Sequence, residues 1–349
     1  MATVSVKASK NYDIIIEKGA LNRAGAIMKA AAGGEKVCVV TDDIVDGLYA
    51  GRLTSSLTAA GYAVEKFVIP HGEQSKCAAE FIRLLNFLAR RRFTRTDVIA
   101  ALGGGVVGDL AGFAAASYTR GMKFVQLPTT LLAAVDSSVG GKTAIDLDAG
   151  KNLAGAFYQP EAVICDYETL DTLSDEIFAD GCAEVIKYAV IADSALFALL
   201  QSPVKAHPEQ VITRCVEIKR DVVAEDEFDT GLRRILNFGH TIGHAVEANS
   251  DFTISHGKGV AIGMCAVAKA SAAYGYCTKD CTGKIIDMVA RYALPTVCPY
   301  GEPQLTAKAL SDKKRRGSTI GLVVPTEIGK CRVVELPVDE LSDFIRAGI

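Results

Sequence analysis

The chain has 349 residues, of which 49% are hydrophobic and 23% are charged, and its formal net charge is -3. This composition excludes a disordered or fibrous protein, and the length allows two domains. The charge balance gives no reason to expect a nucleic acid or an anionic membrane as a partner. No apolar run reaches membrane-spanning length and the first residues form no apolar signal region, so we expect a cytoplasmic protein.

The ten cysteines are scattered through mostly apolar runs and form no paired CxxC zinc pattern. In such surroundings a cysteine behaves as a small hydrophobic residue. We therefore expect buried thiols in a reducing cytoplasm.

Short apolar strands alternate with longer helical patterns in the first half of the chain. Strands are predicted at residues 4–6, 12–16, 36–40, 62–69, 97–102 and 162–165, and helices at residues 45–60 and 78–91. This alternation is typical of a mostly parallel sheet covered by helices. The remaining residues are predicted to be almost wholly helical until two short strands at 320–324 and 331–334, and we place the domain boundary near Leu170.

A GxGxxG motif, formed by Gly103, Gly105 and Gly108, lies between a predicted strand and a small-residue helix at residues 110–117. At such a turn the backbone amides and the helix N-terminus can face a pyrophosphate. The usual acidic residue about twenty positions further on is absent, so a ribose contact would have to come from Asp42 or Glu73, which follow earlier strands. The alternative is a tight turn that only packing requires.

A second glycine-rich stretch, residues 136–143, superficially resembles a P-loop. Asp136 occupies the position where the Walker A motif requires its first glycine, so we reject an NTPase. Lys142, Lys151 and Asn152 could still hold an anionic substrate through charge-assisted hydrogen bonds, although surface lysines are usually just solvated.

Two charges, Glu184 and Lys187, lie three positions apart in an apolar helical stretch at residues 178–191. They are either a surface ion pair or two buried functional charges, and their apolar neighbours favour the second interpretation. The basic run at residues 312–316 is interpreted as a solvated loop that is too short for a nucleic-acid surface.

Three of the five histidines, His240, His244 and His256, fall within seventeen positions. His240 and His244 are four apart on a predicted helix, so both rings leave the same face. Imidazole is the commonest metal ligand, and the cluster predicts a metal or catalytic site rather than three packing residues. Spacing alone pairs His240 with His244.

Several long motifs in this order resemble the 3-dehydroquinate synthase family over essentially the whole chain. The matching runs are residues 103–109, 127–130, 136–142, 150–152, 183–187, 236–244 and 255–257. The resemblance implies an α/β N-terminal Rossmann-like nucleotide-binding domain, residues 1–170, and an all-α C-terminal domain, residues 171–349, for metal and substrate.

The family converts 3-deoxy-D-arabino-heptulosonate 7-phosphate, a small phosphorylated sugar acid of the shikimate pathway, to 3-dehydroquinate and phosphate. The reaction combines transient NAD-dependent oxidation, phosphate elimination, re-reduction and an intramolecular aldol closure. The resemblance therefore implies a lyase with two cofactors, NAD and one divalent metal ion, which is usually zinc, with cobalt as the alternative. A sister sugar-phosphate cyclase, a metal- and NAD-dependent polyol dehydrogenase and, more distantly, a non-enzymatic nucleotide-binding protein remain alternatives.

The resemblance also assigns residues. It implies that Glu184, His240 and His256 bind the metal, whereas spacing alone suggests His240 and His244. It also implies that His244 contacts the substrate. The residues implied for NAD are Asp42, Glu73, Lys76, Gly105, Val106, Val107, Gly108, Asp109, Thr129, Thr130, Lys142, Lys151, Thr169 and Thr172. The residues implied for substrate and catalysis are Asp136, Lys142, Asn152, Lys187, Lys219, Arg233, Asn237, His244 and one of Lys313 and Lys314. Arg120 is implied to reach a neighbouring subunit's site in a homodimer, and Asp229 stands where some members carry glutamate.

Overall fold

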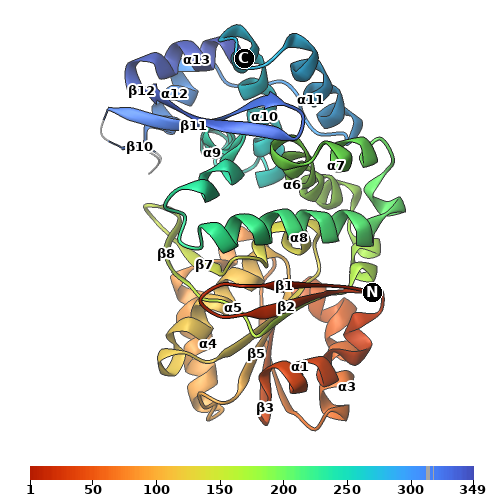
Figure 1. The fold of residues 1–349 in the computed structure, drawn as a ribbon. Helices are drawn as coiled ribbons and strands as arrows, with labels where there is room; N and C mark the ends of the chain where they lie inside the picture. The colour runs from red at the N-terminus through yellow and green to blue at the C-terminus, as the bar shows by residue number, and fades with distance from the viewer. Residues whose placement is uncertain (312–314, 317) are drawn as a thin grey trace. The chain divides into compact units, whose positions relative to one another are not determined.

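The structure is a computed structural model that describes residues 1–311, 315–316 and 318–349. The chain forms two compact units, each of them discontinuous in sequence (Figure 1). The first unit contains Met1–Leu173 and Pro208–Phe228, and the second contains Ser174–His207 and Asp229–Ile349.

A seven-stranded sheet forms the centre of the first unit, in the order β1-β2-β9-β6-β5-β3-β4. Its strands are β1 (Ala2–Val6), β2 (Tyr12–Ile16), β3 (Lys36–Asp42), β4 (Ala63–Ile69), β5 (Val98–Gly103), β6 (Lys123–Pro128) and β9 (Ala162–Cys165). All neighbours are parallel except β1 and β2, which form an antiparallel hairpin. Every residue of β5 is buried, as a near-continuous apolar run in a parallel sheet requires.

Helices cover both faces of this sheet. They are α1 (Ala24–Ala32), α2 (Asp43–Val45), α3 (Gly51–Ala59), α4 (Ala78–Arg90), α5 (Gly105–Ser117) and α8 (Pro208–Glu225), joined by the short helical segments η1 (Ala20–Arg23), η2 (Asp46–Ala50), η3 (Glu73–Ser75), η4 (Tyr118–Arg120), η5 (Ala133–Ser137) and η6 (Tyr167–Thr172). Along β3, Val37 and Val39 pack in one hydrophobic cluster with α1 and α3, whereas Cys38 and Val40 pack in another with α4 and α5. Successive strand residues point to opposite faces, so the alternation builds one core on each side.

The topology of the sheet marks a ligand-binding edge. From β3 the chain continues to β4 on one side, and from β5 it continues to β6 on the other side, while β3 and β5 are neighbours. In open α/β sheets, ligands bind outside the carboxyl ends of the strands at such a switch point. Asp42 ends β3 and Gly103 ends β5, so the predicted nucleotide motif lies at this position.

An antiparallel hairpin, β7 (Lys142–Leu147) and β8 (Gly150–Phe157), was not predicted. It packs against α5 through β7. The sequence there is rich in glycine and charged residues, so it lacks the β-branched pattern that normally indicates strands.

The second unit is mainly helical. Its helices are α6 (Asp175–Ala192), α7 (Ser194–Leu199), α9 (His240–Asn249), α10 (His256–Ala273), α11 (Lys279–Arg291), α12 (Glu302–Ser311) and α13 (Leu341–Gly348), with the 3-10 segments η7 (Val204–Ala206), η8 (Leu232–Asn237) and η9 (Val338–Glu340). Strands β10 (Arg315–Arg316), β11 (Thr319–Glu327) and β12 (Lys330–Pro337) form an antiparallel sheet. Strands β11 and β12 confirm the two short strands predicted at 320–324 and 331–334, so the unit is mainly helical rather than all-α. Thr, Ile and Val on β11 and a turn at Gly329 explain the hairpin.

One helix belongs to a different unit from the one predicted. The boundary near Leu170 lies close to Leu173, where the first unit is interrupted, but α8 returns to the first unit and packs against β1, β2 and η5. Its apolar pattern does not identify the surface it covers, so only tertiary contacts decide its membership. None of the helices in the described ranges is both long and apolar enough to cross a membrane.

Candidate functional site

Helices α9 and α10 are in close backbone contact at glycines. A Cβ atom on Gly263 would lie 1.9 Å from the carbonyl oxygen of Gly239, closer than real Cβ atoms approach anything. The absence of side chains lets α10 lie directly against the start of α9. The first residue of each helix is a histidine, and the ring centroids of His240 and His256 are 5.3 Å apart.

The start of α10 is also attached to α6. The Asp180 carboxylate accepts hydrogen bonds from the Ser255 hydroxyl, at 2.5 Å, and from the backbone N–H of Lys258, at 3.0 Å. A residue of one helix thus caps the N-terminus of another. A Cβ on Gly257 would lie 2.1 Å from the Asp180 carbonyl oxygen. This contact holds His256 against the helix that carries Glu184.

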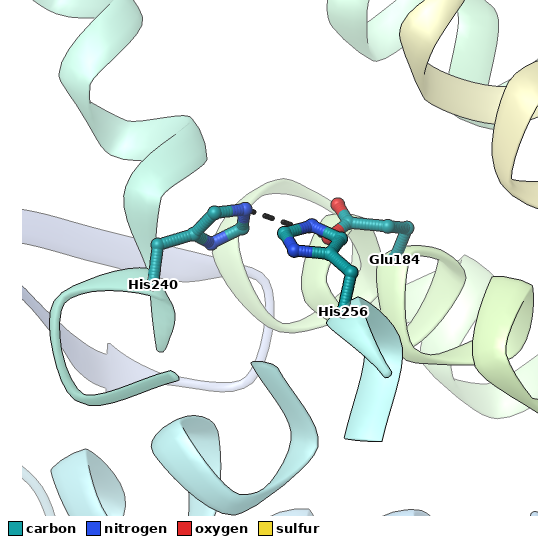
Figure 2. Close-up of side chains that lie close together, drawn as sticks. All are labelled: Glu184, His240 and His256. Atoms are coloured by element: carbon teal, nitrogen blue, oxygen red, sulfur yellow. Dashed lines mark ion pairs between the residues drawn. The ribbon is translucent and has the colours of Figure 1, made fainter. Parts of the chain in front are cut away.

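Three side chains converge on one point in the second unit, and Figure 2 shows the rings of His240 and His256 beside the carboxylate of Glu184. Glu184 Oε1 lies 3.5 Å from His240 Nε2 and 3.4 Å from His256 Nε2. Donor atoms bonded to a tetrahedral zinc ion at about 2.1 Å lie about 3.4 Å apart. These residues, which we call the donor triangle, therefore have the chemistry and spacing of a metal site with three protein ligands.

The two rings are oriented through their other nitrogens. His240 Nδ1 lies 3.0 Å from the Phe238 carbonyl oxygen, and His256 Nδ1 lies 3.2 Å from Glu247 Oε2. Burial lowers the pKa of His240 well below its usual value, so this ring is neutral, as a metal ligand must be. Burial also opposes protonation of His256, but its hydrogen bonds to Glu184 and Glu247 outweigh burial and raise its pKa to about 10. Without a metal this ring is therefore a cation, and a metal ion that binds it must displace the proton on Nε2.

The buried carboxylate of Glu184 has a cation beside it. Lys187 forms an ion pair with Glu184 across one helical turn, and both side chains are almost completely buried. The surface ion pair was therefore wrong and the burial of both charges is confirmed, although the two residues do form an i,i+3 pair. A buried charge requires such compensation.

The other predicted residues of the second unit lie near the start of α9. Arg233 is 2% exposed and precedes the half-buried Asn237. The ring centroid of His244 is 5.5 Å from that of His240 and 6.0 Å from that of His256. His240 and His244 are thus close, as spacing predicted, but Glu184 and His256 complete the donor triangle with His240. Lys313 and Lys314 lie outside the described residues.

In the first unit, the predicted substrate residues lie on η5, α8 and the β7–β8 hairpin. Lys219 Nζ lies 2.6 Å from Asp136 Oδ1 and 2.7 Å from the Asp136 carbonyl oxygen. Lys142 and Asn152 are exposed. Arg120 is exposed on a turn where Thr119 and Arg120 both have positive φ, 51° and 63°. Such backbone costs on the order of 1–3 kcal/mol per residue and is often retained at functional sites.

The predicted nucleotide residues gather at the carboxyl edge of the sheet. Helix α5 begins at Gly105, directly after β5, so its N-terminus lies at this edge. Among the described residues, the buried Thr129 hydroxyl has no hydrogen-bond partner, as expected for a group that meets a ligand. The Asp42 carboxylate accepts from the N–H groups of Ile44 and Val45, which places it at the end of β3.

Lys76 is the centre of a charged cluster at the same edge. Its Nζ lies 2.5 Å from Asp109 Oδ2 and 2.6 Å from Asn152 Oδ1, and Lys151 pairs with Glu73 at 3.6 Å. Burial opposes protonation, but the Asp109 and Glu73 carboxylates outweigh it and raise the pKa of Lys76. Burial raises the pKa of Asp109, and Lys76 opposes that shift. We conclude that Lys76 remains an ammonium group that anchors this edge.

The remaining predicted nucleotide residues serve the fold in identifiable ways. A Cβ on Gly108 would lie 2.7 Å from Gln126 Oε1, so a side chain there would displace the amide end of Gln126. Val107 belongs to the hydrophobic core, which leaves only its backbone to meet a ligand. The Thr169 hydroxyl donates to the Asp166 carbonyl oxygen, and the Thr172 hydroxyl is hydrogen-bonded to Tyr49. Val106 and Thr130 are partly exposed at this edge.

Comparison with known proteins gives a consistent result over the whole chain. Family models described as 3-dehydroquinate synthase N-terminal and C-terminal match residues 66–180 and 181–315. The 3-dehydroquinate synthase of Enterococcus faecalis strain OG1RF is 43% identical over 342 residues, which cover 96% of each chain.

The chain belongs to the 3-dehydroquinate synthase family.

Solved structures of other sugar-phosphate cyclases share the fold. The 2-epi-5-epi-valiolone synthase ValA of Streptomyces hygroscopicus subsp. jinggangensis 5008, solved with NAD+ and Zn2+, has a TM-score of 0.88 and 25% identity over 98% of both chains. A 2-deoxy-scyllo-inosose synthase with carbaglucose-6-phosphate, NAD+ and Co2+ has a TM-score of 0.87 and 23% identity over 100% of both chains. The predicted family, fold class and 3-dehydroquinate synthase activity are confirmed.

Sequence reasoning missed several residues that shape this family member's site. Glu247 follows His244 by three positions on the same helix, and Asp180 precedes Glu184 by one turn, so helical periodicity was a usable signal for both. Asp146 is a third case, because its carboxylate accepts the N–H of Asn152 at 2.7 Å and fixes the positive-φ turn there. Nothing in the local sequence indicated that contact.

Replacing Gly257 by alanine is expected to weaken metal binding. The new Cβ would force α10 away from Asp180 and shift His256 relative to Glu184, at a cost of about 1–3 kcal/mol in the free energy of unfolding. Thermal denaturation and zinc titration against a chelator of known affinity measure the two effects. Gly283→Ala on α11 is the control, because no atom lies within 4 Å of its Cβ position, and it should leave zinc affinity unchanged. Wild-type zinc affinity in Gly257→Ala would contradict the packing argument.

Proposed function

We propose that this chain catalyses the conversion of 3-deoxy-D-arabino-heptulosonate 7-phosphate to 3-dehydroquinate and phosphate with bound NAD and one divalent metal ion. The observation that carries the proposal is the donor triangle of Glu184, His240 and His256, in a chain 43% identical to a 3-dehydroquinate synthase. When bound, the metal acidifies the substrate hydroxyl that it contacts, and NAD accepts and later returns a hydride.

The donor triangle suits a divalent ion of the zinc class. Two imidazole nitrogens and one carboxylate oxygen are the ligand set of many catalytic zinc sites, which keep a further position open. The structures solved with NAD+ and Zn2+ and with NAD+ and Co2+ support the same class of ion. Zinc is our proposal, with cobalt as the alternative.

The carboxyl edge of the sheet in the first unit is proposed to bind NAD. The N-terminus of α5 and the glycines before it can meet the pyrophosphate through backbone amides. Asp42 and Glu73 are carboxylates that could accept ribose hydroxyls, and Thr129 offers a buried hydroxyl. Asp109 and Lys151 are held in place by Lys76 and Glu73, respectively.

Cationic side chains are proposed to bind the two anionic groups of the substrate. The candidates are Lys142, Lys187, Lys219 and Arg233. The planar guanidinium of Arg233 can bind a carboxylate or a phosphate with two parallel hydrogen bonds, and its burial strengthens them. Asp136 orients the Lys219 ammonium, which limits its rotation before substrate arrives.

Uncharged groups are proposed to contact the substrate's hydroxyl groups. His244 and Asn237 lie on or just before α9, whose first residue His240 belongs to the donor triangle. The half-buried imidazole of His244 has ring nitrogens that can donate or accept a hydrogen bond. Asn152 offers a side-chain amide, and its carbonyl oxygen already accepts from Lys76.

We also propose a homodimer in the cytoplasm, with Arg120 reaching the site of the neighbouring subunit. The two consecutive positive-φ residues Thr119 and Arg120 support a functional role for this turn, since neither is glycine. The Arg95 guanidinium donates to the Thr119 carbonyl oxygen at 3.1 Å and helps hold the turn. The cysteine thiols, six of them buried, are consistent with a reducing compartment.

A direct assay tests the activity. Purified protein with NAD, zinc and 3-deoxy-D-arabino-heptulosonate 7-phosphate is expected to release phosphate and dehydroquinate in equal amounts, with no net NADH. Net NADH, seen by ultraviolet absorbance, would instead indicate a polyol dehydrogenase. Turnover only with a phosphorylated sugar that lacks the carboxylate would indicate a sister cyclase, and no turnover with any of these substrates would indicate a nucleotide-binding protein.

Removing one ligand tests the metal site. In His240→Ala the bound zinc should fall from about one ion per chain to almost none while the protein stays folded, because two remaining protein ligands hold zinc weakly. Elemental analysis measures the metal, and circular dichroism checks the fold. Full zinc occupancy in the variant would disprove the ligand assignment.

Arg233→Ala tests anion binding. We expect kcat/KM to fall by a factor of about 10 to 100 or more, because a charge-assisted hydrogen bond to a buried anion contributes about 1.5–3 kcal/mol. In Arg233→Lys the fall in kcat/KM should be smaller, because lysine keeps the positive charge but lacks the planar guanidinium group. The control is Arg234→Ala, whose guanidinium pairs with Glu335 at 2.8 Å instead. Equal kcat/KM for wild type and Arg233→Ala would remove Arg233 from the site.

A further inference from the structure

The two histidines of the donor triangle are held by different kinds of acceptor. His240 Nδ1 faces a neutral backbone carbonyl, that of Phe238, two residues earlier on its own chain segment. His256 Nδ1 faces the carboxylate of Glu247, which comes from another helix. Both arrangements leave Nε2 directed at Glu184, but only the second places a negative charge behind the ring.

Glu247 is placed for this contact by the same helix that carries His240. It is 3% exposed, and burial of a carboxylate is unfavourable unless hydrogen bonds and positive charge compensate it. Glycines let α9 and α10 approach, and a Cβ on Gly259 would lie 3.1 Å from Glu247 Cγ. Glycine at position 259 therefore leaves room for the Glu247 side chain, which reaches His256.

We propose that Glu247 is a positioning residue that accepts a hydrogen bond from Nδ1–H of His256 and thereby presents Nε2 of that ring to the metal. This inference rests on the proposed metal site and adds a residue to it. This hydrogen bond prevents the His256 ring from rotating and disfavours the neutral tautomer that carries its proton on Nε2. The negative charge of the carboxylate also makes Nε2 a stronger electron donor to a metal.

An alternative role for Glu247 is as a ligand in a second metal site. Donor atoms of His244, Glu247 and His256 lie within 4.8 Å of one another. A metal there would require His256 Nδ1 as a ligand, while Nε2 is directed at the donor triangle. A neutral imidazole has only one nitrogen lone pair available for a metal, so the ring cannot serve both ions without losing its remaining proton. The geometry therefore favours a hydrogen bond at Nδ1.

The test compares Glu247→Ala with Glu247→Gln. Glutamine keeps the size and an oxygen acceptor, whereas alanine removes the acceptor. Loss of such an outer contact typically lowers metal affinity by about 10- to 100-fold. We expect that loss in Glu247→Ala, and a zinc affinity within a few-fold of wild type in Glu247→Gln. Chelator competition measures the affinity, and Glu302→Gln is the matched control, because its carboxylate contacts Thr306 and Arg346 instead.

Nitrogen NMR of histidine-labelled, zinc-loaded protein gives a second readout that a general loss of stability would not produce. The Nδ1–H signal of His256 should shift upfield or exchange away in Glu247→Ala and persist in Glu247→Gln, while the Nδ1–H signal of His240, bonded to Phe238, stays in place in both. Thermal denaturation confirms that each variant is folded.

Three results would overturn the inference. They are unchanged zinc affinity in Glu247→Ala, equal losses in the alanine and glutamine variants, and two zinc ions per wild-type chain that fall to one in Glu247→Ala. Absence of zinc binding by the wild-type protein would be a failure of the proposed metal site itself. Wild-type binding that is insensitive to Glu247 would leave that site standing and remove only the role of Glu247.

Discussion

Direct backbone contact between helices is the constraint on which the candidate metal centre depends. Gly243 and Gly259 face each other across α9 and α10, and a Cβ on Gly243 would lie 2.9 Å from the backbone of Gly259. Gly257 makes an equally close contact with α6. Side chains at these positions would separate the helices by the width of a methyl group or more. The ligand atoms of the donor triangle would then be too far apart for a single ion.

This packing concentrates charge in a region with little water. Glu184 and Glu247 are both buried, and Lys187 is the cation paired with Glu184. Electrostatic interactions are stronger in such surroundings than in water, and so is the penalty for any charge that is left uncompensated. A divalent cation would therefore be favoured electrostatically, and the anionic side chains that attract it also fix the orientation of His256. Stability and function are linked here through the same contacts.

In the first unit, too, the start of a helix lies at the candidate binding site. Its parallel sheet directs the carboxyl ends of β3 and β5 to one edge, where the N-terminus of α5 supplies backbone donors. Gly257 and Gly263 allow α10 to lie against the backbone of its neighbours, whereas Gly108 on α5 faces only the amide end of the Gln126 side chain. In both units the first turn of a helix carries the candidate chemistry, and in the second unit the absence of side chains sets the position of that helix.

The sequence by itself determined the alternating strands and helices, the glycine motif after β5, the histidine cluster and the family, because these depend on local periodicity and on long ordered motifs. It did not determine which acceptor each ring nitrogen meets, or that α8 packs with the first unit. Spacing within one helix favoured His244 as the companion of His240, and the family resemblance named Glu184 and His256 instead. The tertiary structure brings the donor atoms of Glu184, His240 and His256 together. Local sequence describes neighbours along a helix, but donors from three helices meet only when their backbones have packed.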